Sequence, residues 1–226
     1  MKKFWSALTL SFILAAAWGQ DSEVRSVGSF TGIKAAEAID VYLKKGDRES
    51  VRVEVSGTDI SNVLTEVSGS YLKIHMRDGR YRNRNVKVYV TYVSLNKLHV
   101  SSAANVFSDG TIKAKTMDIS ASSAGSAELS IDAESVSIDA SSAGDIVLEG
   151  RAVNIEVEVS SAGEIDAYGL ESENGNASAS SAGSAKISVS KELTAQASSG
   201  GSIRYRGSPA KTNTSSSSGG SVKKSN

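Results

Sequence analysis

A four-residue motif, Ser-Ser-[Ala/Gly]-[Ala/Gly], recurs at nearly constant spacing through the second half of this 226-residue chain. Successive copies are separated by 21, 19, 19, 20, 18 and 19 residues, and the seven copies begin at Ser101, Ser122, Ser141, Ser160, Ser180, Ser198 and Ser217. A fixed period of this length indicates stacked structural units, each of which buries its apolar face against its neighbours.

The residues around each copy alternate between apolar and polar side chains. In one repeat, the alternate positions are Ile119, Ala121, Ser123, Gly125, Ala127, Leu129 and Ile131. Alternation with period two indicates an extended strand with one buried face. The chain is expected to bend where that face shrinks to Ser123 and Gly125, and glycine would permit a positive φ there. In the alternative register, Ala124 and its equivalents point inward.

These features predict an all-β protein, a parallel β-helix in which one solenoid turn, or rung, takes about 19 residues. Rungs stack at about 4.8 Å, so six intervals correspond to roughly 29 Å. An array of separate hairpins is the competing architecture, but the repeats lack the Asn-Gly and Asp-Gly turns that hairpins favour. Residues 101–210 form the regular repeats, and the polar segment 211–226 is expected to be a frayed or capping tail.

The N-terminal third of the chain is also strand-like but irregular. Alternating runs lie at 39–43, 51–55, 72–76 and 86–90, with turn residues between them. We interpret residues 28–100 as the opening strands and cap of the same solenoid, so that residues 28–210 form one domain after a short segment at 20–27.

The first nineteen residues are typical of a secretory signal peptide. Two lysines precede an apolar run from Phe4 to Trp18, and small residues at Ala17 and Gly19 predict cleavage before Gln20. A retained N-terminal anchor is the alternative. The run is shorter than the roughly 20 residues a bilayer span needs, and no other stretch is apolar enough to cross. We therefore expect an exported protein in the periplasm, on the outer surface or outside the cell.

Several short segments resemble one known family. They are Phe30–Ile33, Ile39–Leu43, Tyr71–Ile74, Val86–Val90 and the Ser-Ser-Ala-Gly repeats. Together they are similar, over residues 28–205, to the putative auto-transporter adhesin, head GIN domain family, which is common in Bacteroidetes. The resemblance implies a right-handed parallel β-helix, a cell-envelope or secreted location and an adhesive role, and it brings no catalytic residues.

Composition limits the chemistry that this chain can perform. There is no cysteine, and Lys+Arg and Asp+Glu are both 25, which gives no overall attraction to nucleic acid. His75 and His99 are isolated and are expected to point outward, and no His pair or Asp-rich calcium loop is present, so no metal or cofactor is expected. Serine is abundant, but nothing marks one serine as an activated nucleophile.

Carboxylates on the strands carry the alternative prediction of an enzyme. Some β-helix enzymes that act on acidic polysaccharides use acidic side chains on an outer face. The candidate acids are Asp118, Asp132, Asp139, Glu156, Glu158 and Asp166. They do not repeat in register, so solvated strand faces are the favoured interpretation, and a polysaccharide lyase or glycosidase remains the second hypothesis.

The densest charge cluster is the segment from Arg77 to Arg84, which contains four arginines and one acid. It is predicted to be a loop around Asp78-Gly79. Guanidinium groups bind carboxylates, sulfates and phosphates through paired hydrogen bonds, and a tyrosine ring can stack on a sugar. The candidate ligand-binding residues are therefore Arg80, Tyr81, Arg82 and Arg84. A solvated loop whose charges discourage aggregation is the plainer interpretation.

The sequence thus predicts an adhesin-like binding or structural module without catalytic activity. Its expected partners are envelope or host glycans, or another surface protein.

Overall fold

The computed structural model describes residues 21–225, so the predicted signal peptide and its cleavage site lie outside the described residues. The predicted parallel solenoid is confirmed, with about seven turns of roughly 19 residues each. Within the described residues the one helical element is a 3₁₀ turn, η1 (Ile60–Asn62), and no helix there is long and apolar enough to span a bilayer.

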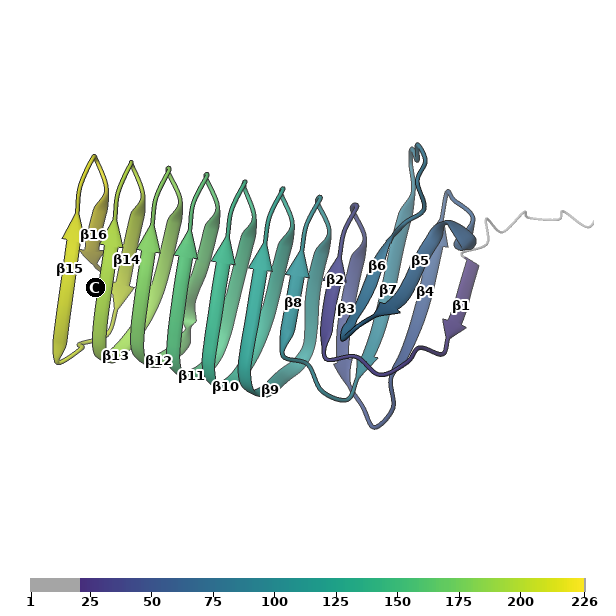
Figure 1. Cartoon of the computed structure of the whole chain (residues 1–226), viewed down its shortest axis with the longest axis horizontal. Helices are drawn as coiled ribbons and strands as arrows, with labels where there is room; N and C mark the ends of the chain where they lie inside the picture. Colours follow the sequence, from purple (N-terminus) through teal and green to yellow (C-terminus); the bar gives the residue numbers. More distant parts are fainter. Residues whose placement is uncertain (1–20, 226) are drawn as a thin grey trace, which may run out of the picture.

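Five long strands build the regular part of the solenoid, and each pairs in parallel with the next. They are β9 (Asn105–Ala121), β10 (Ser126–Ala140), β11 (Asp145–Val159), β12 (Glu164–Ala179) and β13 (Ser184–Ala197). Each strand bends midway, so its two halves lie in opposite walls. The pairing of β13 shows this, because its first half pairs with β14 (Ser202–Arg206) and its second half with β15 (Lys211–Ser216). Figure 1 shows the two walls and, along one edge, a row of narrow arches that join them.

The arches are the Ser-Ser-Ala-Gly segments, and their backbone differs from the predicted one. The prediction placed Ser123 inside, but Ser123 and Ala124 are both exposed and take positive φ angles of 50° and 59°. Gly125 is buried, as one of the two predicted registers required. Strict alternation fails because two consecutive left-handed residues reverse the chain. In this arch they are a serine and an alanine, and in the last two arches Gly200 and Gly219 take the second position.

Hydrogen bonds between neighbouring arches support this strained geometry. The N–H of Ala124 donates to the carbonyl of Ser142 in the next arch at 3.1 Å. Within the arch, the N–H of Gly125 donates to the carbonyl of Ser122 at 2.9 Å. A left-handed L-residue costs about 1–2 kcal/mol. The repeated bonding from arch to arch offsets that cost, which gives a physical reason for the constant spacing of the motif.

The N-terminal strands do not follow the chain order in space. Strands β2 (Gly32–Ala35) and β3 (Asp40–Lys45) form a rung that lies between two later ones. On one side are β6 (Tyr71–Met76) and β7 (Asn85–Tyr92), and on the other are β8 (Lys97–Val100) and β9. On the outer face Tyr42 of β3 accordingly stacks on Tyr89 at 5.1 Å and on Phe107 at 5.4 Å between ring centroids.

Three antiparallel strands extend the walls at this end of the solenoid. Strand β4 (Ser50–Ser56) pairs with β7, β5 (Val63–Ser68) pairs with β6, and β1 (Asp21–Arg25) pairs with β4. The buried valines of β4 and β5 join one continuous aliphatic core that runs through to Ile203 in β14.

The polar segment after residue 210 forms one more rung instead of a frayed end. Strand β15 pairs with β13, and β16 (Ser221–Lys224) pairs with β14. Parallel pairing uses backbone groups, so a strand with few apolar side chains can still extend the ladder. This rung covers the last apolar one, and Val222 packs against the core.

Candidate functional site: a basic loop in place of an arch

The loop from Arg77 to Arg84 joins β6 to β7, at the position where other rungs have an arch. It is longer than the Ser-Ser-Ala-Gly turns and projects beyond the row of arches (Figure 1). Its neighbour is the arch of the β2–β3 rung, in which Glu37 and Ala38 take φ angles of 69° and 51°. The sequence pattern did not reveal this additional arch, because Glu37 replaces the second serine and Ile39 replaces the glycine.

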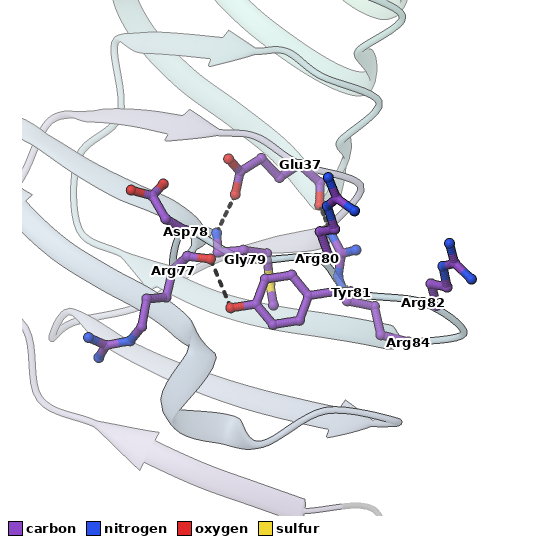
Figure 2. A pocket seen from close by; sticks show the side chains of 9 residues that line it. Glu37, Arg77, Asp78, Gly79, Arg80, Tyr81, Arg82 and Arg84 are labelled. Atoms are coloured by element: carbon purple, nitrogen blue, oxygen red, sulfur yellow. Dashed lines mark hydrogen bonds between the residues drawn. The ribbon is translucent and has the colours of Figure 1, made fainter.

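Two side chains hold the loop in shape. The hydroxyl of Tyr81 donates a 2.8 Å hydrogen bond to the carbonyl of Arg77. The guanidinium of Arg84 lies 5.4 Å from the centre of the Tyr81 ring and donates to the carbonyl of Glu37. Figure 2 shows Tyr81 at the centre of this arrangement. Both side chains are half-buried, and they tie the loop to itself and to the adjacent arch.

The acidic side chain of the adjacent arch is engaged with the backbone. The carboxylate of Glu37 accepts a 2.6 Å hydrogen bond from the N–H of Met76. It is therefore not ion-paired with the arginines of the loop. This contact links residues 39 positions apart, and no pattern in the sequence pointed to it.

Arg80 and Arg82 are exposed, and neither has a hydrogen bond or ion pair within residues 21–225. In Figure 2 Arg82 points away from the rest of the loop. Arg77 makes one long contact, 3.5 Å from its guanidinium to the carbonyl of Ser61. The loop thus presents free guanidinium groups around a rigid tyrosine.

The four predicted binding residues, Arg80, Tyr81, Arg82 and Arg84, do come together. All four line a hollow of about 480 Å³, together with Glu37, Met76, Arg77, Asp78 and Gly79. Their positions divide them into two pairs, because Tyr81 and Arg84 shape the hollow while Arg80 and Arg82 are free to contact a ligand. That this hollow binds a ligand is still a prediction.

The overall neutrality of the chain conceals a separation of charge. Residues 121–190 contain 12 acidic and 2 basic residues, a net charge of 2 − 12 = −10. Residues 21–120 contain 15 basic and 12 acidic residues, a net charge of 15 − 12 = +3. The free arginines thus lie at a basic end, next to an acidic middle section that would repel an anionic ligand.

Two of the carboxylates that are candidates for catalysis are paired with cations. Asp132 accepts two hydrogen bonds from Arg151 at 2.9 and 2.8 Å, and this pairing lowers the pKa of Asp132. Asp166 accepts one from Lys186 at 3.0 Å.

The other candidate acids and the histidines lie on the outer faces of the strands. Partial burial and, secondarily, nearby Asp118 raise the pKa of Asp139. His75 and His99 are half-buried on outer faces. Within residues 21–225, no three His, Asp or Glu side chains are placed to hold a metal ion.

Fold and surface together define a class: a parallel β-solenoid that displays a basic loop at one end. The chain belongs to the family described as putative auto-transporter adhesin, head GIN domain, whose model matches residues 29–209. The resemblance noted in the sequence is thereby confirmed. No curated protein matches the chain.

Solved structures of three proteins with the same fold illustrate the likeness. A putative adhesin from Bacteroides fragilis is 18% identical with a TM-score of 0.83, and the match covers 92% of this chain and 97% of that one. A putative adhesin from Parabacteroides distasonis is 20% identical with a TM-score of 0.72 (92% and 98%). A putative lipid binding protein from the same species is 17% identical with a TM-score of 0.67 (93% and 98%). At these identities the likeness establishes the shared fold.

Proposed function

We propose that this protein is an exported, non-catalytic, adhesin-like binding module whose loop 77–84 binds acidic glycans. The observation that carries the proposal is the pair of exposed, unpaired guanidinium groups of Arg80 and Arg82, placed around the fixed ring of Tyr81. The family description supports an adhesive role, and the apolar run at residues 4–18 supports export.

The chemistry of the loop favours an anionic sugar polymer over a neutral one. A guanidinium matches the two oxygens of a carboxylate or sulfate with two parallel hydrogen bonds. The bond from Tyr81 to Arg77 and the contact with Arg84 hold the ring in place before a ligand arrives. Less conformational entropy is then lost on binding, which improves affinity without any further contact.

Direct binding measurements test the proposal. The chain from residue 20 onward is presented to a sulfated glycan, a polyuronate and a neutral glucan at low and moderate salt. We expect binding to the two acidic polymers that weakens as salt rises, because exposed charges are screened. Arg80→Ala/Arg82→Ala is expected to weaken this binding at least tenfold. The matched control is Lys113→Ala/Lys115→Ala, which removes two exposed cations elsewhere on the solenoid.

The outcomes separate the competing functions. Equal binding by the arginine variant and the lysine control would remove the loop as the site. New reducing ends in the glycan samples would favour the hypothesis of a carbohydrate-active enzyme. Binding to vesicles of anionic lipid, but not to any glycan, would indicate that the ligand is a lipid surface and not a glycan.

A further inference from the structure

A row of basic side chains crosses the outer wall next to the basic loop. Lys73 of β6 lies directly beside Lys34 of β2, and Lys34 lies directly beside His99 of β8. Adjacent strands are about 4.8 Å apart, and like charges at directly facing positions destabilise a sheet. Within residues 21–225 neither lysine has a carboxylate within ion-pair distance, although the exposed Glu66 faces Lys73 from β5. The fold thus places two ammonium groups side by side, and neither is in an ion pair among residues 21–225.

Neighbouring groups hold two members of this row in place. The ammonium of Lys34 lies 4.6 Å from the centre of the Tyr71 ring. The hydroxyl of Tyr71 is 3.3 Å from Nε2 of His99, and Nδ1 of His99 is hydrogen-bonded to the hydroxyl of Ser120. Lys34 is therefore positioned before any ligand binds, while Lys73 is free to move toward one.

A hollow of about 440 Å³ on the outer wall is lined by Lys34, Lys73 and His99, together with His75, Ser101 and Ser122. Ammonium groups and hydroxyls donate hydrogen bonds, and they match the acceptor oxygens of sulfate or carboxylate groups. Lys73 is half-buried, so its contacts with an anion are screened less than those of the exposed Lys34.

The wall hollow adjoins the hollow of the loop. Ala36 and His75 line the first, and the next residue of each segment, Glu37 and Met76, lines the second. The loop begins at Arg77, four residues beyond Lys73, so its start lies about 13 Å from Lys73 at strand spacing. A flexible anionic chain can therefore contact both hollows at once.

We propose that the wall hollow is a second anion subsite, in which Lys34 and Lys73 bind a sulfate or carboxylate group of the same acidic glycan that the loop binds. This inference rests on the proposed function and extends it, since it assigns a linear polyanion at least about 13 Å long as the ligand. Two linked contacts raise affinity through effective concentration, so affinity depends on the length of the glycan.

The test compares a sulfated glucosamine–uronate hexasaccharide with the corresponding disaccharide, by calorimetry on the chain from residue 20 onward. We expect Lys34→Gln/Lys73→Gln to weaken hexasaccharide binding about tenfold and to leave disaccharide binding at the loop unchanged. Glutamine keeps the first two methylenes of the lysine side chain and removes its charge, and thermal unfolding verifies that the variant is folded. Lys34→Arg/Lys73→Arg retains the charges and is expected to restore hexasaccharide affinity. Lys113→Gln/Lys115→Gln is the matched control.

The possible results distinguish failure of the wall subsite from failure of the proposed function of the loop. If the lysine variant binds the hexasaccharide like the control while Arg80→Ala/Arg82→Ala does not bind it, the wall subsite is refuted and the loop site stands. If the lysine variant alone loses binding, the wall hollow stands as an anion site and the proposed function of the loop fails. If wild type binds both sugars equally, the two-subsite model is overturned.

Discussion

In the arch that contains Ala162 and Gly163, replacing the glycine with alanine and replacing the alanine with glycine should have opposite effects on stability. Gly163 is buried, and a Cβ built there would lie 2.6 Å from the carbonyl oxygen of Ala140 in the preceding rung. Ordinary contact begins at 3.4 Å, so the two rungs must separate by 3.4 − 2.6 = 0.8 Å to accommodate Gly163→Ala. Overpacking of this kind costs about 1–3 kcal/mol.

At the preceding residue, Ala162, the side chain has space but the backbone conformation is unfavourable. Ala162 is exposed and has a φ of 59°, which costs an L-residue about 1–2 kcal/mol. Ala162→Gly removes that cost and adds about 0.5–1 kcal/mol of unfolded-chain entropy. The net expectation is a protein that is more stable by about 0.5–1 kcal/mol.

Thermal unfolding followed by circular dichroism measures both variants. For a chain of this size about 1 kcal/mol shifts the melting temperature by roughly 2–4 °C, so Gly163→Ala is expected to melt about 2–12 °C lower. Gly69→Ala is the control, because Gly69 has a φ of 61° but no neighbouring atom within 4 Å of the added Cβ. It isolates the conformational cost from the steric one.

A neutral Gly163→Ala together with a destabilising Ala162→Gly would refute this reasoning. That result would mean that alanine points inward and glycine outward, which is the other register that the sequence allowed. The same comparison can be repeated in the two neighbouring arches, where a Cβ added to Gly144 or Gly183 would meet the carbonyl of Ala121 or Val159 in the preceding rung.

Three further perturbations follow from burial and charge. Partial burial and the neighbouring Glu164 and Asp166 raise the pKa of Asp145, so its protonated form favours folding below the ordinary aspartate pKa and this contribution is lost as pH rises. Asp145→Asn should therefore stabilise the protein at pH 7 and not at pH 3, and equal urea midpoints at pH 7 would contradict this. Partial burial lowers the pKa of His99, so stability present above its ordinary value of about 6.5 declines as pH falls toward the folded-state pKa. His99→Gln should flatten the loss of stability between pH 7 and 5, and an unchanged slope would rule out His99 as its source. Ile187→Ala empties a fully buried position and should cost about 2–5 kcal/mol in urea denaturation, whereas a loss below 1 kcal/mol would mean that the core relaxes around the gap.

The basic loop shows how far local sequence could predict the candidate site. A run of arginines around Asp78-Gly79 predicted a charged loop, because such residues cannot be buried in a strand. The sequence did not separate Arg84, which supports the loop, from Arg82, which is free. That distinction depends on the carbonyl of Glu37, which only the folded chain brings close.

The wall hollow was outside the reach of sequence patterns for the same reason. Lys34, Lys73 and His99 are far apart in the chain, and each one alone is an ordinary outward-facing strand residue. They become neighbours because the β2–β3 rung is inserted between two rungs formed later in the sequence.

The sequence by itself determined the solenoid and its repeat length, because alternation and periodicity are local properties that specify strands and their stacking. It also determined which positions supply the core, from Ile119 and Leu129 through to Ile203. The tertiary structure alone decided the backbone conformation of the arches, the insertion of the β2–β3 rung and which groups neighbour each charged side chain. These depend on carbonyls and side chains contributed by other rungs, whose order in space differs from their order in the chain.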